Sequence, residues 1–252
     1  AQDRLNEKIY LESVGFKAAP FLPVNGPEDI VSALENFGSP VVVKTRRFGY
    51  DGKGQVKLSE PKEANDAWVE LGCSPSIAEG FIDFVREISV ITARDIGGNI
   101  VSYPAVENRH ENHILRQTIA PAPDLGKLAA EAEHLAANAI AGLDMVGLLA
   151  IEMFVTRENN LIVNEMAPRP HNSGHWTMDF AATSQFEQLV RCAMGLPLGS
   201  TEVLCPAEMQ NILGDEVYDW PQLLADPKIH LHLYGKNEAR KGRKMGHWNR
   251  AI

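Results

Sequence analysis

Short apolar runs separated by polar or glycine-containing turns recur along the chain and predict a protein rich in β-strands. Segments in which apolar residues recur every three or four positions predict helices between these strands. Strands are expected at 40–44, 56–58, 77–82, 87–93, 100–106, 148–155 and 161–165, and helices at 3–14, 27–37, 64–71, 128–143 and 185–194. This mixture predicts an α+β fold.

The expected helices also carry predictions about their ends and buried faces. Asp3 is expected to cap the first helix, with Leu5 and Ile9 on its buried face. Ser184 and Glu187 have the spacing of a capping box at the start of the last helix. The buried stripe of that helix is expected to comprise Phe186, Leu189, Val190 and Ala193.

Two of the expected strands, 148–155 and 161–165, are joined by a polar turn and carry one glutamate each. If the hairpin closes symmetrically about Glu158 and Asn159, Glu152 lies directly opposite Glu165. Like charges in opposed positions are destabilising unless a cation lies between them. Hard carboxylate oxygens suit Mg²⁺ or Mn²⁺, so the pair predicts a divalent cation site. The alternative is a one-residue shift in register, which would send one glutamate to solvent.

A second hairpin has a glycine-rich tip between residues 48 and 55. Its three glycines allow close approach of the backbone to a ligand, and Lys44 and Lys53 add positive charge. The tip is therefore a candidate to fold over phosphates. The spacing matches neither GxxxxGK[ST] nor GxGxxG, and a simple tight turn remains the alternative.

Two polar segments are expected to be loops. Residues 108–113 contain two histidines, which would either contact a nucleotide or be solvated. Residues 167–176 contain His171 and His175 at the spacing of a zinc-binding helix, but two prolines and Gly174 argue against such a helix. We interpret the second segment as a substrate-binding loop.

Near the C-terminus, positive charge is concentrated in a short stretch that contains only one acidic residue, Glu238. Such a cluster suits either a phosphate-bearing substrate or a solvated basic tail, and both interpretations stay open. Its basic residues are Lys236, Arg240, Lys241, Arg243, Lys244 and Arg250.

Composition narrows the class of protein. A chain of 252 residues with a net charge of −9 has no general cationic field, so nucleic acid and anionic membrane are not expected partners. The three cysteines form no CxxC pair, which is typical of a reducing cytoplasm. The first residues, AQDRLNEKIY, are charged and lack the apolar core of a signal peptide, and no apolar run in the sequence is long enough for a membrane span.

Taken together, these motifs resemble the ATP-grasp ligases. More narrowly, VVVKTRRFGYDGKGQ, NEMAPRPHNSGHW and GRKMGHWN are similar to the 5-(carboxyamino)imidazole ribonucleotide synthases, ATP-dependent carboxylases of purine biosynthesis. The resemblance implies an ATP-grasp fold of two subdomains, 1–78 and 79–195, followed by a small β-rich domain at 196–252. Members of that family usually carry an additional N-terminal domain, so we expect this chain to be a fragment or a trimmed form.

The resemblance also implies a nucleotide site. Lys44 would hold ATP phosphates and a lid would close over them. The lid comprises Gly49, Tyr50, Asp51, Gly52, Lys53, Gly54 and Gln55. The adenine pocket would comprise Glu79, Gly80, Phe81 and Ile82. Glu87 would bind the ribose, His110 would lie near the nucleotide, and Asn164 would lie at the phosphates. Glu152 and Glu165 would ligate Mg²⁺ or Mn²⁺.

For the acceptor, the resemblance implies 5-aminoimidazole ribonucleotide and bicarbonate as substrates. Asp51, Lys53 and Arg169 would be the catalytic residues, and Lys236 and Arg243 would bind the 5′-phosphate. The rest of the substrate cavity comprises Tyr50, His171, Asn172 and Ser173. Many ATP-grasp enzymes carry an asparagine two positions after the second metal glutamate, where this chain has Ala167.

We therefore expect a cytoplasmic ligase that makes 5-(carboxyamino)imidazole ribonucleotide through carboxyphosphate and forms a homodimer. Two alternatives remain at this point. One is another ATP-grasp carboxylate–amine ligase, such as a formate-using transformylase or a biotin carboxylase relative. The other is a nucleotide-binding fragment without activity.

Overall fold

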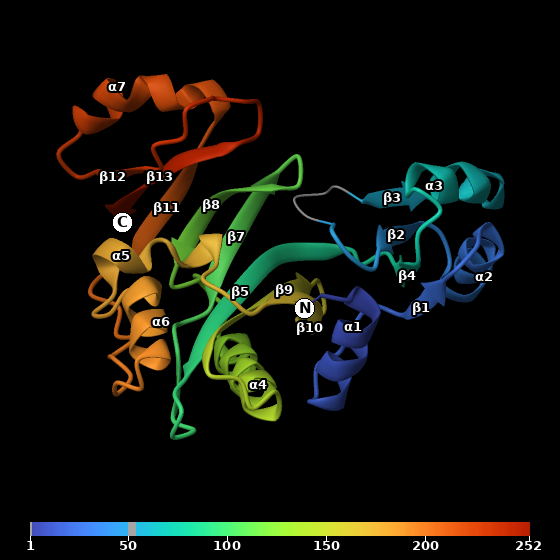
Figure 1. The fold of residues 1–252 in the computed structure, drawn as a ribbon, viewed down its shortest axis with the longest axis horizontal. Coiled ribbons are helices and arrows are strands. Elements are labelled where there is room, and N and C mark those ends of the chain that lie inside the picture. The colour runs from blue at the N-terminus through green and yellow to red at the C-terminus, as the bar shows by residue number, and fades with distance from the viewer. Residues whose placement is uncertain (1, 50–53) are drawn as a thin grey trace. The chain divides into compact units, whose positions relative to one another are not determined.

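The computed structural model describes residues 2–49 and 54–252, and it divides into two compact units (Figure 1). The first unit comprises residues 1–85 with 153–166, and the second comprises 86–152 with 167–252. The boundary between Glu152 and Met153 falls inside one strand, so both units share that strand.

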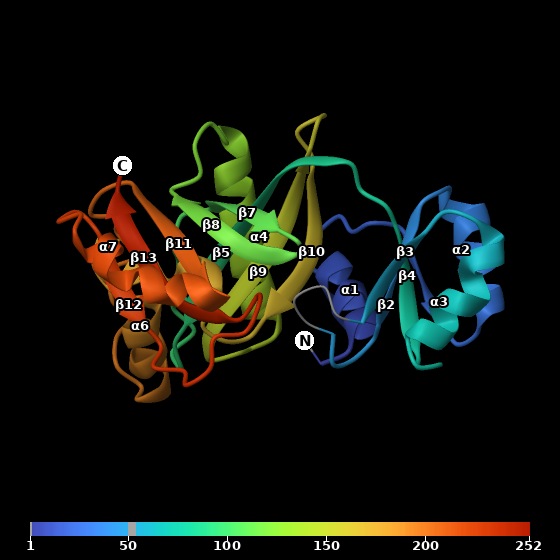
Figure 2. The same ribbon diagram turned by 90° about the horizontal axis from the view of Figure 1, so that it is seen from above.

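The first unit is a four-stranded antiparallel sheet with three helices. Its sheet order is β1-β4-β2-β3. The strands are β1 (Phe21–Val24), β2 (Val41–Thr45), β3 (Gln55–Leu58) and β4 (Ser76–Gly80), and the helices are α1 (Arg4–Ser13), α2 (Pro27–Phe37) and α3 (Ala64–Glu70), with a 3₁₀ turn at Pro61–Glu63. Helices α2 and α3 lie side by side, and apolar residues of this unit form one core that includes Ile30, Val41 and Ala78 (Figures 1 and 2).

In the described part of the chain, a larger, nine-stranded sheet has the order β10-β9-β5-β7-β8-β11-β13-β12, with β6 paired to β5. It supplies the strands of the second unit, whereas its residues 153–166, in β9 and β10, are counted with the first unit. The strands are β5 (Phe84–Arg94), β6 (Ile100–Ser102), β7 (Val106–Glu111), β8 (Ile114–Ala120), β9 (Gly147–Thr156), β10 (Leu161–Ala167), β11 (Ala207–Leu213), β12 (His230–Leu233) and β13 (Lys244–Ala251). The helices are α4 (Lys127–Gly142), α5 (Thr177–Phe180), α6 (Gln185–Ala193) and α7 (Trp220–Leu224), with 3₁₀ turns at Asn172–Gly174 and Gly214–Asp219.

The core of the second unit explains why its strands are so apolar. Tyr103 and Trp176 are almost fully buried and meet edge to face, with ring centroids 6.4 Å apart. Inward-facing residues of the sheet surround them, among them Ile91, Leu148 and Met209. Burial of such side chains supplies the main free energy of folding.

Helix α1 confirms the predicted cap but not the predicted buried face. The Asp3 carboxylate accepts hydrogen bonds from the backbone N–H groups of Leu5 and Asn6. Ile9, however, is 53% exposed, whereas the charged residues Glu7 and Lys8 are buried. The prediction for Ile9 is therefore wrong, because this helix turns a charged face inward, where it forms specific polar contacts.

Helix α6 shows a similar reversal. Ser184 caps it as predicted, accepting from the Glu187 N–H, but Val190 is 57% exposed. Its buried face carries two glutamines that bond backbone groups of neighbouring segments, Gln185 at His171 and Gln188 at Gly199. The prediction is wrong for Phe186, Val190 and Ala193, which are exposed, whereas Leu189 packs partly buried against the core. The glutamines take the buried face because buried backbone groups need polar partners.

Residues 108–113 are also not the loop that their polarity predicts. Residues 108–111 form the end of β7, and Asn112 and His113, both with positive φ, make the turn into β8. Asn108 pairs directly with Thr118 in this hairpin. Among the described residues, no helix has the length and apolar character that crossing a membrane requires.

A histidine cluster packs α5 against the end of the sheet. The His247 ring lies 4.8 Å from the His175 ring and 4.6 Å from the His232 ring, between centroids. Asp179 accepts from His232 at 2.8 Å and from the Asn249 amide at 2.6 Å. Burial, together with the neighbouring histidines, lowers the pKa of His175 to about 4 and that of His247 to about 3.

These lowered pKa values predict a loss of stability in mild acid. In the unfolded chain both histidines titrate near pH 6.5, so below that pH the unfolded state binds more protons than the folded state. Each histidine should then remove about 1.4 kcal/mol of unfolding free energy per pH unit between about pH 6 and 5. The measurement is urea unfolding across this range.

His247→Gln should reduce the slope of unfolding free energy against pH. His134→Gln, at an exposed position on α4, is the matched control and should leave the slope unchanged. Equal slopes in the wild type and His247→Gln would show that the folded state does not keep the His247 imidazole uncharged.

Candidate functional site

In the first unit, a buried carboxylate lies between two lysines. Glu79 on β4 contacts Lys44 of β2 at 2.9 Å and Lys8 of α1 at 3.5 Å. Burial would raise the pKa of Glu79, but the two ammonium groups lower it below its ordinary value. Burial lowers the pKa of Lys8, and Glu79 offsets part of that effect. The group holds an ionised carboxylate and presents Lys44 at the edge of the buried region.

Lys44 is also the residue predicted to hold ATP phosphates. Its ammonium group lies 3.4 Å from the Asn164 side-chain oxygen on β10, so two predicted nucleotide residues meet here. Lys8 donates to the Val163 carbonyl at 3.1 Å, next to Asn164. The structure thus brings Lys44, Glu79 and Asn164 together.

Helix α1 holds the end of β10, which the sequence did not predict. Arg4 donates to Glu165 Oε2 at 2.7 Å, and Glu7 accepts from the Met166 N–H at 2.7 Å. Burial raises the pKa of Glu7. The signal in the sequence was the charged pattern Arg4, Glu7 and Lys8, since these positions share one helical face.

The turn of the carboxylate hairpin differs from the prediction by one residue. Thr156 donates its N–H to the Asn160 carbonyl at 3.0 Å, so the turn centres on Glu158. Asn159 takes the left-handed conformation, with φ of 58°, which is typical of a three-residue hairpin loop. The symmetric closure about Glu158 and Asn159 is wrong, and the turn does not place Glu152 opposite Glu165.

Further along β10 the alternation of buried and exposed residues breaks. Asn164 and Glu165 are both half-buried, between the buried Val163 and Met166. The Met166 N–H donates to the Glu7 carboxylate at 2.7 Å. Helix α1 thus engages β10 directly after the two predicted site residues Asn164 and Glu165.

In the second unit, Glu152 meets a histidine of the predicted substrate loop. Its Oε1 lies 2.8 Å from Nε2 of His171. Burial would raise the pKa of Glu152, but the hydrogen bond from His171 and the nearby charges of His110 and Lys244 lower it. Glu87 and His110 form a second pair at 3.1 Å, and this pairing raises the pKa of His110 despite its burial.

The remaining residues of the substrate loop differ in exposure. Asn172 exchanges two amide hydrogen bonds with Asn211 of β11, at 2.9 and 2.6 Å. Ser173 is fully buried and bonds to His171 and Ser89. Arg169 is exposed and donates to the Pro170 carbonyl.

In the basic segment near the C-terminus, two of the cationic side chains donate hydrogen bonds to backbone carbonyls of the same segment. Lys236 donates to the Lys244 carbonyl at 2.6 Å, and Arg243 donates to the Glu238 carbonyl at 2.9 Å. Partial burial and the nearby charges of Arg243 and Lys244 lower the pKa of Lys236. Positive charge is therefore concentrated around Lys236.

The glycine-rich tip is described only at its two ends. Four of its predicted residues, Tyr50, Asp51, Gly52 and Lys53, lie outside the described residues. Gly49 precedes them, and Gln55 begins β3 opposite Lys44. Of the predicted adenine residues, Gly80 ends β4, while Phe81 and Ile82 follow it, with Lys57 3.9 Å from the Phe81 ring centroid.

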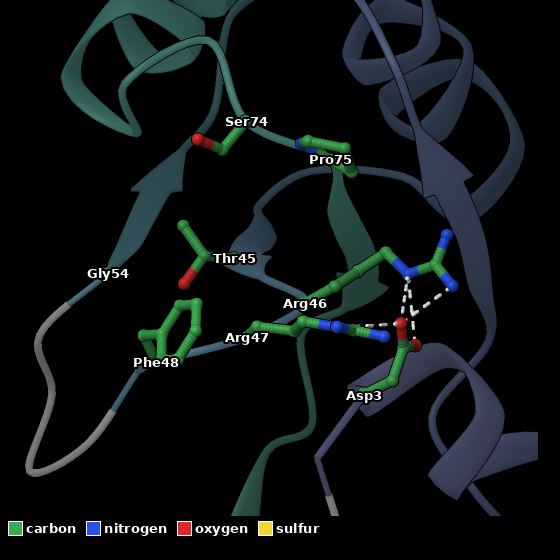
Figure 3. A pocket seen from close by; sticks show the side chains of 8 residues that line it. All are labelled: Asp3, Thr45, Arg46, Arg47, Phe48, Gly54, Ser74 and Pro75. Carbon is green, nitrogen blue, oxygen red and sulfur yellow. Dashed lines mark hydrogen bonds and ion pairs between the residues drawn. The ribbon is translucent and has the colours of Figure 1, made fainter.

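A pocket of about 640 Å³ lies beside the base of this tip (Figure 3). Asp3, Arg46 and Arg47 line it. The Asp3 carboxylate accepts a hydrogen bond from Arg46 at 3.0 Å and forms an ion pair with Arg47 at 3.7 Å. The rest of the lining comprises Thr45, Phe48, Gly54, Ser74 and Pro75.

The two predicted metal carboxylates fit a hard cation that takes few protein ligands. Among the described residues, the contacts of Glu165 and of Glu152 each use one carboxylate oxygen, through Arg4 and His171. The described chain contains no group of three or more His, Cys, Asp or Glu side chains placed to hold a metal ion. Mg²⁺ commonly uses one or two carboxylates together with substrate phosphates.

Two family models match the chain. The ATP-grasp domain matches residues 9–186, and the phosphoribosylaminoimidazole carboxylase C-terminal domain matches residues 207–251.

Named relatives agree with these matches. An N5-carboxyaminoimidazole ribonucleotide synthase from Brucella melitensis is 43% identical over 99% of this chain and 70% of its own length. A bifunctional purine synthesis protein from Dictyostelium discoideum is 42% identical over 98% of this chain, which spans only 27% of that protein.

A crystal structure of the Aspergillus clavatus N5-carboxyaminoimidazole synthase, in complex with ADP and 5-aminoimidazole ribonucleotide, superposes with a TM-score of 0.92. It is 30% identical, and the match covers 100% of this chain and 68% of that one. The chain therefore belongs to the ATP-grasp superfamily and, within it, to the N5-carboxyaminoimidazole ribonucleotide synthase family.

Proposed function

We propose that this chain carboxylates 5-aminoimidazole ribonucleotide, with ATP and bicarbonate, to 5-(carboxyamino)imidazole ribonucleotide in purine biosynthesis. The observation that carries the proposal is the presence of both an ATP-grasp domain and a phosphoribosylaminoimidazole carboxylase C-terminal domain in one chain. The complex of the Aspergillus relative with ADP and 5-aminoimidazole ribonucleotide supports the same pair of ligands.

For the nucleotide, Lys44 is the phosphate ligand. Its contacts with Glu79 and Asn164 hold the ammonium group in place before ATP binds, which limits the entropy lost on binding. The glycine-rich tip from Gly49 to Gln55 closes over the phosphates. Residues 79–82 receive the adenine, and Glu87 and His110 contact the ribose side of the nucleotide.

Glu152 and Glu165, on the two strands of one hairpin, would hold Mg²⁺, for which Mn²⁺ could substitute. When bound, such a cation would supply positive charge to the phosphates. Arg4 and His171 each engage one oxygen of these carboxylates. The other oxygen of each is the proposed metal ligand.

For the acceptor, Lys236 and Arg243 bind the 5′-phosphate, since both belong to the basic segment near the C-terminus and carry positive charge. Tyr50, Arg169, His171, Asn172 and Ser173 belong to the substrate cavity.

In the reaction, a bicarbonate oxygen attacks the γ-phosphorus of ATP, the bond to the β-phosphate oxygen breaks, and ADP leaves. Carboxyphosphate results. The exocyclic amine of the ribonucleotide then bonds to its carbon, phosphate leaves, and Asp51 accepts the amine proton, with Lys53 and Arg169 offsetting the developing negative charge. Closure of the tip keeps water from hydrolysing carboxyphosphate. We further propose a cytoplasmic homodimer.

Glu165→Gln should reduce ADP formation by at least a hundredfold, about 2.7 kcal/mol, because it removes a carboxylate that binds the metal. The fold should survive, because the ion pair with Arg4 is partly exposed and contributes no more than about 1 kcal/mol. Steady-state ADP release and thermal unfolding provide the two readouts. Glu158→Gln, at the exposed turn of the same hairpin, is the control, and full activity in Glu165→Gln would remove the metal assignment.

Arg243→Gln should raise KM for 5-aminoimidazole ribonucleotide about 10- to 100-fold and leave KM for ATP unchanged, because a charge-assisted bond to phosphate is worth about 1.5–3 kcal/mol. Initial rates at varied concentrations of each substrate measure both constants. The control is Arg240→Gln, since Arg240 is exposed and pairs with Glu238. Parallel increases in both KM values would contradict a specific phosphate clamp.

A further inference from the structure

A chain of buried hydrogen bonds runs through the second unit and ends at Glu152. Its links are Thr118 Oγ1 to Asn108 Oδ1 (2.9 Å), Asn108 Nδ2 to Ser89 Oγ (2.8 Å), Ser89 Oγ to Ser173 Oγ (2.8 Å), Ser173 Oγ to His171 Nδ1 (2.8 Å), and His171 Nε2 to Glu152 Oε1 (2.8 Å). Thr118, Ser89 and Ser173 are fully buried, and Asn108 and His171 nearly so. We call these five residues before Glu152 the relay.

The amide of Asn108 gives the relay a direction. Its oxygen accepts from Thr118, so its nitrogen donates to Ser89. Ser89 Oγ accepts this hydrogen bond and donates its own hydroxyl hydrogen to Ser173 Oγ. Ser173 in turn has one hydroxyl proton, and the remaining acceptor beside it is His171 Nδ1.

A second contact supports the same direction independently of the Asn108 amide. His171 caps the 3₁₀ turn Asn172–Gly174, and its Nδ1 accepts from the Ser173 backbone N–H at 3.3 Å. A backbone N–H can only donate, so Nδ1 must present a lone pair. The ring proton therefore lies on Nε2, which faces the Glu152 carboxylate.

The group superficially resembles a Ser–His–Glu triad, but its geometry excludes nucleophilic catalysis. Ser173 is fully buried and its hydroxyl is engaged by Ser89 and His171, so it is not presented as a free nucleophile. In a triad the carboxylate orients the histidine and the serine faces the substrate. Here the order is reversed, and the carboxylate is the end of the relay that the proposed function uses.

We propose that the relay fixes His171 as its Nε2–H tautomer and thereby holds Oε1 of Glu152 in one orientation. Thr118, Asn108, Ser89 and Ser173 are then positioning residues that act through His171. In its last step the inference rests on the proposed function: with Oε1 occupied by His171, Oε2 is the oxygen that Glu152 offers to Mg²⁺. Partners behind metal ligands commonly change metal affinity or activity about 10- to 100-fold when removed.

The first test needs no nucleotide, metal or acceptor. Long-range ¹H–¹⁵N correlation spectra of the chain labelled with ¹⁵N-histidine report which ring nitrogen of His171 carries the proton. His171→Gln assigns the signals by their loss. At neutral pH the relay predicts a protonated Nε2 and a bare Nδ1, with slow exchange of the Nε2 proton with water. The opposite tautomer would overturn the inference.

The second test breaks the relay at Ser89, which contacts neither His171 nor Glu152 directly. Ser89→Ala should speed exchange of the His171 Nε2 proton and weaken Mn²⁺ binding, followed by electron paramagnetic resonance, about tenfold. Ser102→Ala is the matched control. Ser102 lies on β6 and makes a comparable hydroxyl contact with Thr92, which is on β5, the strand that carries Ser89. Ser102→Ala should change neither quantity.

The two tests separate the inference from the proposed function. If Ser89→Ala and Ser102→Ala behave alike in proton exchange, the relay does not position His171, whatever the enzyme carboxylates. If the tautomer and the exchange rates are as expected but Mn²⁺ does not bind the wild type, the relay stands as far as Glu152 and the metal assignment of the proposed function fails.

Discussion

Pairing of buried carboxylates with specific donors is the constraint on which the rest of this structure depends. Glu79 is held by two lysines, Glu165 by Arg4, and Glu152 by His171. Removing one partner of a fully buried charge pair, such as Glu79 with its lysines, typically costs about 3–5 kcal/mol, a large part of the 5–15 kcal/mol that usually stabilises a domain. The partly exposed Arg4–Glu165 pair contributes no more than about 1 kcal/mol. Elements far apart in sequence are therefore bound to one another through charges as well as through apolar packing.

This constraint also explains the behaviour of α1 and β10. A helix that turned Leu5 and Ile9 inward would leave Glu79 with one lysine and Glu165 without its arginine. By burying Lys8 the helix helps to keep Glu79 ionised, and through Arg4 it engages Glu165 on β10. The same contacts stabilise the fold and arrange the groups that the proposed reaction needs.

The sequence predicted most elements and the chemical type of the site, because strand alternation, glycine-rich tips and paired carboxylates are local signals. Helix α2 runs from Pro27 to Phe37 as expected. The register of the hairpin was not predictable in the same way, since it depends on whether Asn159 adopts positive φ. The polar contacts of Ser89, Asn108 and Thr118 were missed because they join residues from three strands. Polar residues inside otherwise apolar strands were the available signal.

The most direct measurement of the central claim is ADP release by the purified chain with Mg²⁺, ATP and bicarbonate, in the presence and absence of 5-aminoimidazole ribonucleotide. The account predicts that the ribonucleotide stimulates ADP release and that label from ¹³C-bicarbonate appears in its carbamate. Absence of stimulation by this acceptor, or stimulation instead by formate with another ribotide or by biotin, would contradict it.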